Sequence, residues 1–296
     1  MPTSFDPSSN RSDEFRIALA QIAPKLGDVT RNLEVHRQQI NLAREKGADL
    51  IVFPELSLTG YFLRDMVPDV ALAADADELQ ALADAAGKAA VVVGFVEESP
   101  DRRFYNSALY AENGHILHIH RKVYLPTYGL FEEQRYFAAG ERIRAFDTAR
   151  FGRVGLLVCE DFWHLSAAVI MQAEGVDLLI CVSNSPARGI DGPKIRTAEV
   201  YERLAKMYAQ MIGAVVVVAN RVGFEDGLCF WGGSLAVGPD GNTLAEAPSL
   251  DESLTIATFD PAELRRQRLI TPLARDEKLL LTIEELERIK CDRYTD

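Results

Sequence analysis

The sequence predicts a layered α/β fold, because short apolar runs alternate along the chain with segments of helical periodicity. The runs at 49–53, 177–183 and 214–220 are rich in aliphatic residues. Strands buried on both faces of a sheet have such continuous apolar runs, whereas half-exposed strands alternate between apolar and polar residues. We therefore expect strands that are covered by helices on both sides.

The first predicted helix lies in segment 27–48, where Leu33, Ile40 and Ala43 recur at helical spacing before Gly47. Two alternating runs follow further along, separated by the turn-forming residues "ENGH", and this pattern indicates a hairpin. The other elements expected in this half are strands at 15–22, 49–53 and 89–97, a helix near 77–88, and the hairpin strands at 104–111 and 115–122.

Segment 123–143 is aromatic and turn-rich with little periodicity, so we expect a long ordered loop there. The second half of the chain then resumes the alternation of strands and helices. Its second helix has an apolar face made of Val200, Leu204, Met207 and Met211. The elements expected in this half are strands at 153–159, 177–183, 214–220, 232–238 and 253–260, a helix near 163–174, and an extended helical tail from Pro261.

Composition and charge narrow the possible functions. The 296 residues have a net charge of -12 and no cluster of Lys and Arg, which argues against a nucleic-acid partner. No apolar run approaches the roughly 18 residues that a membrane span needs, and the N-terminus lacks the apolar segment of a secretory signal. We expect a cytoplasmic protein with no membrane association and with reduced cysteines.

No repeat or Gly-Ser linker divides the chain, so we expect one main domain. The predicted organisation is a flexible N-terminal segment at 1–13, the main domain at 14–275, and a C-terminal tail at 276–296. The tail mixes charged and apolar residues in a way that is suited to an oligomer interface.

Three chemically versatile residues occupy the same kind of position. Glu55 follows the strand at 49–53, Lys122 follows "LHIHR", and Cys159 follows "GLLV". Crevices outside the carboxyl ends of strands are the usual ligand sites of α/β sheets, so these residues can meet in space. The acidic neighbours of Cys159 raise the pKa of its thiol, and a nucleophile at this position needs help from Glu55 and Lys122.

The blocks "FPELSLTGY", "HRKVYLP" and "LLVCEDFW" resemble the catalytic blocks of the nitrilase, or carbon-nitrogen hydrolase, superfamily. The resemblance implies a four-layer α-β-β-α sandwich. It also implies a triad in which Cys159 is the nucleophile, Glu55 the general base and Lys122 the oxyanion stabiliser. Glu133 matches a second structural glutamate. These residues need no metal and no organic cofactor.

Within the superfamily, "YLPTYGLFEEQRYF" and "CEDFW" look more like the glutaminase domains of glutamine-dependent NAD synthetases than like aliphatic amidases or nitrilases. By this resemblance Tyr128, Glu160 and Ser185 hold the substrate. The arginine that would bind a glutamine carboxylate corresponds here to Asp191. Other basic residues are close to it in sequence, namely Arg188, Lys194 and Arg196.

Simpler interpretations stay open for several of these residues. A cysteine at the end of an apolar strand is, by itself, more often a core residue than a nucleophile. His164 could form a dyad with Cys159, although a helix that begins between them would point the two side chains apart. His118 and His120 share a face of a strand and could hold a metal, yet no third ligand is identifiable from spacing.

The resulting hypothesis is a cysteine-dependent hydrolase that cleaves a small linear amide through a thioester and releases ammonia. The first alternative is a glutaminase-like subunit that supplies ammonia to a separate synthetase, because the chain as given ends at Asp296 with no phosphate-binding loop after the hydrolase region. The second alternative is a non-catalytic binding or regulatory protein. A nitrilase ranks below the amidases because Glu160 stands where nitrilases carry tryptophan. The resemblance also implies a homodimer or a higher homo-oligomer.

Overall fold

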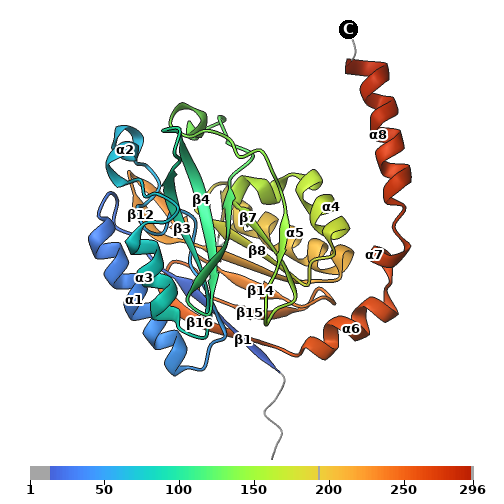
Figure 1. Cartoon of the computed structure of the whole chain (residues 1–296), viewed down its shortest axis with the longest axis horizontal. Coiled ribbons are helices and arrows are strands. Elements are labelled where there is room, and N and C mark those ends of the chain that lie inside the picture. Colours follow the sequence, from blue (N-terminus) through green and yellow to red (C-terminus); the bar gives the residue numbers. More distant parts are fainter. Residues whose placement is uncertain (1–13, 193, 295–296) are drawn as a thin grey trace, which may run out of the picture.

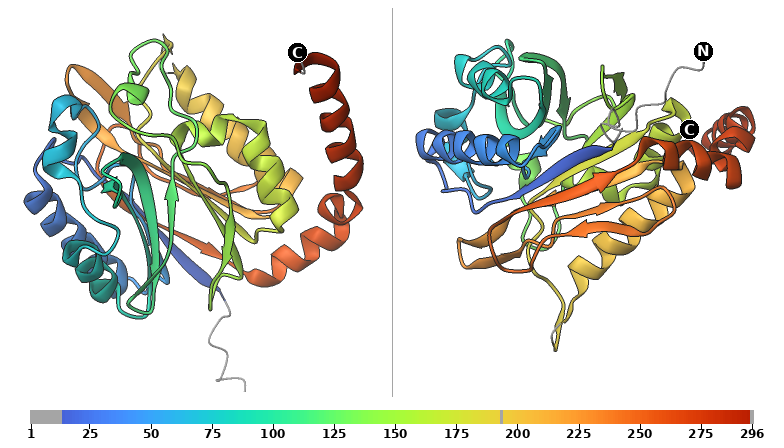
Figure 2. Two further views of the ribbon diagram at one scale, coloured as in Figure 1. Left: turned by 45° about the horizontal axis from the view of Figure 1, so that its top comes forward. Right: turned by 90° about the horizontal axis from the view of Figure 1, so that it is seen from below.

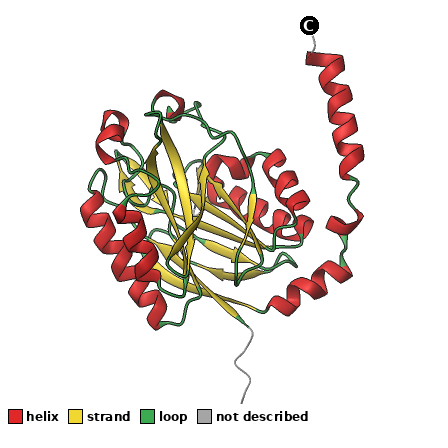
Figure 3. Ribbon diagram, in the orientation of Figure 1, coloured by secondary structure: helices red, strands yellow, loops and turns green. Residues whose placement is uncertain are grey.

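A computed structural model describes residues 14–192 and 194–294, and the predicted flexible segment at 1–13 lies outside this range. Two six-stranded sheets pack face to face, and helices cover both outer faces (Figure 1). Figure 3 shows the two sheets enclosed between the helices. The predicted α-β-β-α sandwich is therefore confirmed.

In the first sheet β1, β2 and β3 are parallel, and the predicted hairpin of β4 and β5 follows β3 and forms one edge of the sheet. Residues of β16 pair antiparallel with β1 at the other edge. In spatial order the strands are β16 (Ser253–Phe259), β1 (Phe15–Gln21), β2 (Leu50–Val52), β3 (Ala90–Glu98), β4 (Phe104–Glu112) and β5 (His115–Arg121).

The second sheet has three parallel central strands, β7, β8 and β11, with shorter antiparallel strands at both edges. In spatial order the strands are β15 (Thr243–Glu246), β14 (Leu235–Val237), β11 (Val215–Asn220), β8 (Leu178–Ser183), β7 (Arg153–Val158) and β6 (Ala145–Asp147). Two small hairpins complete the strands, formed by β9 (Ile190–Asp191) with β10 (Lys194–Ile195) and β12 (Val222–Glu225) with β13 (Leu228–Trp231).

The outer helices cover different sheets (Figure 2). The first sheet packs against α1 (Val29–Glu45) and α3 (Asp77–Ala86), and the second packs against α4 (Leu165–Glu174) and α5 (Arg196–Ile212). The remaining helical segments are α2 (Val67–Val70), α6 (Pro261–Ile270), α7 (Leu273–Asp276) and α8 (Leu279–Tyr294), with 3-10 turns η2 (Arg64–Met66), η3 (Glu133–Arg135) and η4 (Cys159–Trp163).

Burial explains the continuous apolar strands. In β1, Ile17 and Leu19 face the space between the sheets, whereas Ala18 and Ala20 face the helices. The residues of β11 also alternate between the space between the sheets and the helices, because successive residues of a strand point to opposite faces. Both faces of each central strand are therefore buried, as the sequence predicted.

The structure corrects the orientation of α5. The predicted apolar face contains Met207 and Met211, which are 39% and 47% exposed, while Val200 and Leu204 are partly buried. The helix has two apolar stripes, and periodicity alone does not say which one meets the sheet. The face that is buried consists of Thr197, Tyr201, Ala205, Tyr208, Ala209 and Ile212.

The C-terminal helices lie outside the four layers (Figure 1). No described residue of α8 is buried, and its exposed side chains include Leu280 and Leu286. The last sheet strand ends at Phe259, so the chain leaves the sandwich before the predicted tail at 276–296 begins. None of the helices described in the structure is both long and apolar enough to cross a lipid bilayer.

Candidate active site

Glu55 is fully buried just beyond the carboxyl end of β2. Its Oε1 accepts hydrogen bonds from Asn106 Nδ2 (2.7 Å) and Lys122 Nζ (2.8 Å), and its Oε2 accepts from the backbone N of Asn184 (2.7 Å). An ionised carboxylate has about four acceptor positions. Three donors from both sheets thus hold Glu55 and leave capacity for another proton donor.

A close backbone contact fixes the loop that carries Glu55. Gly94 of β3 lies directly beneath this loop, and a Cβ atom there would stand 2.4 Å from Leu56 N and 2.5 Å from Pro54 O. Any larger residue would push the loop away from the sheet. Glycine at this position therefore helps to set the height of the Glu55 carboxylate.

Lys122 is a buried charge held by two carboxylates. Its side chain is fully buried, and Nζ donates to Glu55 Oε1 and to Glu133 Oε1, which is 2.7 Å away. Burial by itself lowers the pKa of this ammonium. The nearby charges of Glu133 and Glu55 outweigh that effect and hold the pKa well above its ordinary value. Lys122 is therefore a permanent cation at this site.

Glu133 enters from η3 in the long loop that the sequence predicted. Its Oε1 also accepts a hydrogen bond from the Tyr61 hydroxyl, at 2.5 Å. Burial raises the pKa of Glu133 to about 7, and the charge of Glu55 adds to this rise, whereas Lys122 opposes it. The structure thus brings Glu55, Lys122 and Glu133 into direct contact, from three loops that are distant in sequence.

Cys159 lies at a sharp turn from β7 into η4. Its φ of 47° is in the left-handed region, which is unfavourable for a residue with a Cβ. Burial and then the charge of Glu55 raise the pKa of its thiol to about 12, although Lys122 opposes this. Both charges therefore act on the sulfur, and the resting side chain is a protonated thiol.

Asp161 holds this strained turn in place. Its Oδ2 accepts from Val158 N (3.1 Å) and lies 2.8 Å from His120 Nε2, while its Oδ1 accepts from Val123 N (3.0 Å) and Tyr124 N (2.9 Å). One buried carboxylate thus connects the turn after β7 with the segment that directly follows Lys122. The relative position of the thiol and the ammonium depends on this connection.

The predicted substrate-binding residues occupy different environments. The Tyr128 hydroxyl donates to both carboxylate oxygens of Glu160, at 3.1 and 2.9 Å. Glu160 directly follows Cys159 in the η4 turn. Ser185 is buried, and its backbone N donates to Asn220 Oδ1 (2.9 Å). The serine whose hydroxyl lies near the Cys159 sulfur, at 3.4 Å, is Ser183.

Two basic groups lie near this pair: His164, whose Nε2 is 3.8 Å from Glu160 Oε1, and Arg188. Its guanidinium carbon lies 4.9 Å from the ring centre of Phe131 and 5.8 Å from that of Tyr128. Among the described residues, none accepts a hydrogen bond from its buried Nε. Asp191, which occupies the sequence position expected for an arginine, is exposed on β9. The side chain of Lys194 lies outside the described part of the chain.

The histidines have other partners. The His164 ring stacks on Tyr124 with ring centres 3.6 Å apart, and His120 is bonded to Asp161. Burial lowers the pKa of His118 to about 4, and the neighbouring His120 adds to this effect. Within residues 14–192 and 194–294, no group of three or more His, Cys, Asp or Glu side chains is arranged to hold a metal ion.

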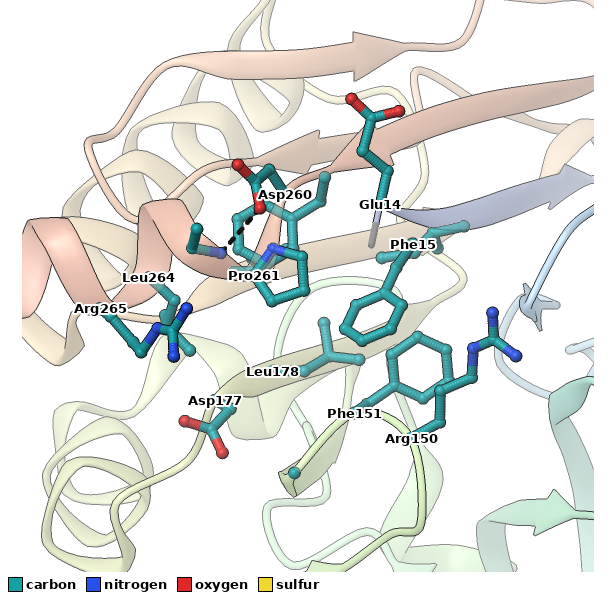
Figure 4. Close-up of a pocket in the computed structure, with 15 residues that line it drawn as sticks. Glu14, Phe15, Arg150, Phe151, Asp177, Leu178, Asp260, Pro261, Leu264 and Arg265 are labelled. Atoms are coloured by element: carbon teal, nitrogen blue, oxygen red, sulfur yellow. Dashed lines mark hydrogen bonds between the residues drawn. The ribbon is translucent and has the colours of Figure 1, made fainter. Parts of the chain in front are cut away.

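A separate cavity of about 650 Å³ opens at the amino ends of the parallel strands, opposite the end where Cys159 lies (Figure 4). Phe15 and Phe151 form its apolar floor, with ring centres 5.0 Å apart, and Asp177 is at its edge. Its lining contains neither a cysteine nor a lysine. The residues that the sequence predicts to be catalytic therefore lie away from this cavity.

A model of the family described as carbon-nitrogen hydrolase matches residues 16–269. The chain belongs to the carbon-nitrogen hydrolase family. This hydrolase is 31% identical over 262 residues to the glutamine-dependent NAD(+) synthetase of Acinetobacter baylyi, in a match that covers 87% of the hydrolase and 46% of the synthetase. It thus spans less than half of the length of that relative. The predicted family and its resemblance to these synthetases are confirmed.

Two solved structures resemble nearly the whole hydrolase. The carbon-nitrogen hydrolase of Helicobacter pylori G27 is 25% identical, with a TM-score of 0.81 over 95% of this chain and 100% of that chain. An amidase of Nesterenkonia sp. AN1, in a form with covalent addition of the acetamide moiety of fluoroacetamide at the active site cysteine, is 25% identical. Its TM-score is 0.76 over 93% of this chain and 98% of that chain.

Sequence reasoning missed several residues that contact the predicted site of the hydrolase. Ser183 and Asn184 follow β8, and the rule that ligands bind at the carboxyl ends of parallel strands could have identified them. Asn106 lies within a strand, and Tyr201 lies on a helix and reaches the sulfur from the outer layer. No local pattern distinguishes these two from ordinary buried polar residues.

We expect Cys159 of the free hydrolase to remain protonated from about pH 6 to about pH 9, since burial and Glu55 raise the pKa of its thiol. The measurement is the ultraviolet absorbance of thiolate as a function of pH, as the difference between the wild type and Cys159→Ala. The difference should stay flat over this range. A rise centred near pH 8 would contradict the expectation.

Proposed function

We propose that this hydrolase cleaves the carbon-nitrogen bond of a small linear amide through a thioester on Cys159 and releases ammonia. The observation that carries the proposal is the buried ammonium of Lys122 between Glu55 and Glu133, beside a thiol on which its charge acts. Burying an ammonium costs several kcal/mol unless it is well paired. A positive charge in such a place suits the stabilisation of a developing oxyanion.

Attack by Cys159 forms the first intermediate. Glu55 takes the thiol proton as the sulfur bonds to the amide carbon, and the carbonyl electron pair moves to oxygen. Lys122 and the backbone N–H of Glu160 stabilise that oxyanion. Because the thiol is protonated at rest, the reaction needs the base, and Glu55 has the acceptor capacity for it.

Two further transfers complete the cycle. The carbon-nitrogen bond breaks as the leaving nitrogen receives the proton from Glu55, which releases ammonia and leaves the thioester. Glu55 then removes a proton from water, whose oxygen attacks the thioester carbon. The carbon-sulfur bond breaks, and the thiol regains its proton as the carboxylic acid leaves. Covalent addition at the active site cysteine of the Nesterenkonia amidase supports a nucleophilic role for Cys159.

A glutaminase activity that supplies ammonia to a separate synthetase is the second candidate, and Arg188 favours it. Glu160 offers a negative charge to a substrate ammonium, and Arg188 offers a positive charge to a substrate carboxylate. Both side chains contact Tyr128, so a substrate bound beside this tyrosine meets both charges. The Nε of Arg188 has no hydrogen-bond partner among the described residues, so it is free to donate a hydrogen bond to such a carboxylate.

We also infer that the partner at the α4–α5 surface is a second copy of this chain. Leu165, Val169, Met207 and Met211 are exposed apolar side chains on these two packed helices. The apolar residues of α8 are exposed as well, which provides another surface that an oligomer would cover. Exposed apolar side chains that gather in a large patch mark protein–protein interaction sites.

We expect the wild type to release ammonia from at least one member of a panel of glutamine, asparagine, short aliphatic amides and N-carbamoyl amines. Cys159→Ala should abolish release, because no other residue replaces the sulfur. Lys122→Met should lower kcat by at least about 100-fold, as the loss of one oxyanion donor does. Failure of the wild type on the whole panel would contradict the function.

Arg188→Ala should raise KM for glutamine by about 10-fold or more, because it removes a charge-assisted hydrogen bond to the carboxylate. Hydrolysis of propionamide, which lacks a carboxylate, is the internal control and should change little. An equal loss with both amides would assign Arg188 a structural role against Phe131. Negligible glutamine turnover by the wild type, with and without candidate synthetases, would reject the glutaminase.

Light scattering at micromolar concentration should give a dimer or a larger assembly. Met211→Glu should weaken that assembly, since it places a charge in the apolar α4–α5 surface. Leu117→Glu is a matched control, because Leu117 is similarly exposed (46%) but lies on β5. A monomeric wild type would contradict the inference.

A further inference from the structure

The sulfur of Cys159 has two hydroxyl neighbours that the proposed reaction has not used. Sγ lies 3.3 Å from the Tyr201 hydroxyl and 3.4 Å from Ser183 Oγ. Ser183 is the last residue of β8, and Tyr201 lies on the buried face of α5. Their exposures are 0% and 1%, so water does not compete for these contacts. The sulfur is thus in contact with the second sheet and with the helix that covers it.

The proton of Ser183 Oγ has two acceptors within reach, the Tyr201 hydroxyl at 2.9 Å and Cys159 Sγ at 3.4 Å, and it serves one of them at a time. The contact with Tyr201 is the shorter one, so we assign the serine proton to it. The phenolic proton of Tyr201 is then available for the sulfur. Burial, followed by the charge that Cys159 carries as a thiolate, raises the pKa of Tyr201 well above its ordinary value. The phenol therefore stays protonated and remains a donor.

The aromatic ring of Tyr201 is held rigidly. It stacks on Phe162 with ring centres 6.1 Å apart, and it meets Trp163 edge to face at 5.5 Å. Both partners belong to the same η4 turn as Cys159. The short segment that carries the thiol therefore also packs against the ring of the donor.

We propose that Tyr201, oriented by Ser183, donates a hydrogen bond to the Cys159 sulfur, which aims the sulfur and stabilises the negative charge that it carries during the reaction. The role in turnover rests on the proposed amide hydrolysis, whereas the contact with the thiol does not. Tyr201 touches a reacting atom, and Ser183 acts through Tyr201 as a positioning residue.

Tyr201 stabilises charge on the sulfur, whereas Lys122 stabilises charge on the carbonyl oxygen. As Glu55 removes the thiol proton, charge develops on sulfur and strengthens the Tyr201 hydrogen bond. When the carbon-sulfur bond forms, the charge moves to the carbonyl oxygen, which Lys122 stabilises. At thioester breakdown the carbon-sulfur bond breaks and its electron pair returns to sulfur. Tyr201 keeps its proton throughout, so it assists both half-reactions without a proton transfer.

The test compares Tyr201→Phe, Ser183→Ala and the control Tyr208→Phe. Tyr208 lies on the same helix, and its buried hydroxyl donates to the carbonyl of Phe162 (3.1 Å) instead of to the sulfur. Iodoacetamide alkylation of the Cys159 peptide is followed by mass spectrometry at about pH 9, with thermal unfolding to verify that each variant is folded. Alkylation reports on the thiol without any substrate.

Tyr201→Phe should slow alkylation by about threefold to tenfold. Losing a hydrogen bond to a charged group lowers the thiolate fraction by about 10- to 100-fold, and the more basic thiolate recovers part of this through higher nucleophilicity. Ser183→Ala should slow it about twofold or more, while Tyr208→Phe should stay within about twofold of the wild type. In turnover, Tyr201→Phe should lower kcat with little change in KM.

Wild-type alkylation rates in both Tyr201→Phe and Ser183→Ala would overturn the proposal. If Tyr201→Phe does not fold, the test rests on Ser183→Ala alone. A wild-type alkylation rate in Ser183→Ala then overturns the proposal. The outcome is independent of the amidase assay. A hydrolase that cleaves no amide but alkylates in a Tyr201-dependent way would keep the donor and refute the proposed function. Amide turnover with Tyr201-independent alkylation and an unchanged kcat would do the reverse.

Discussion

The buried contact of Lys122 with Glu55 and Glu133 is the constraint on which the rest of the site depends. One ammonium and two carboxylates are removed from water, so each charge is tolerated only while the others are in place. Leaving a buried charge unpaired costs about 3 to 5 kcal/mol, which is a large part of the net stability of a domain. Three loops that leave different strands must therefore pack together before the fold is complete, which couples folding to assembly of the site.

The neighbouring groups extend this constraint to the thiol. Asn184 connects Glu55 to the end of β8, and Asp161 connects the segment after Lys122 to the turn of Cys159. The unfavourable φ of Cys159 is compensated by these bonds and by the packing of Phe162 against α5. In this conformation the Cys159 sulfur lies between the two sheets. The charges of Glu55 and Lys122 act on it from the first sheet, and the hydroxyls of Ser183 and Tyr201 contact it from the second sheet and its helix.

The site also divides the stabilisation of charge between two places. In the proposed reaction Lys122 stabilises the carbonyl oxygen, and Tyr201, whose hydroxyl lies 3.3 Å from Cys159 Sγ, stabilises the sulfur. Burial, and then the charge of Glu55, raise the pKa of the thiol, so the cysteine is not a reactive thiolate at rest. A protonated resting thiol lowers the risk of unwanted alkylation or oxidation, since the thiolate is the reactive form.

The sequence by itself determined the layered fold, the order of the main strands and helices, and the motifs that contain Glu55, Lys122, Glu133 and Cys159. These depend on local signals, namely apolar runs, helical spacing and residues at the ends of strands. Only the tertiary structure decided which stripe of α5 faces the sheet, that Arg188 and not Asp191 lies beside Tyr128, and that Asn106, Asp161 and Tyr201 complete the site. Those outcomes depend on contacts between segments far apart in the chain, and side-chain directions at such contacts are set by packing, which no local pattern encodes.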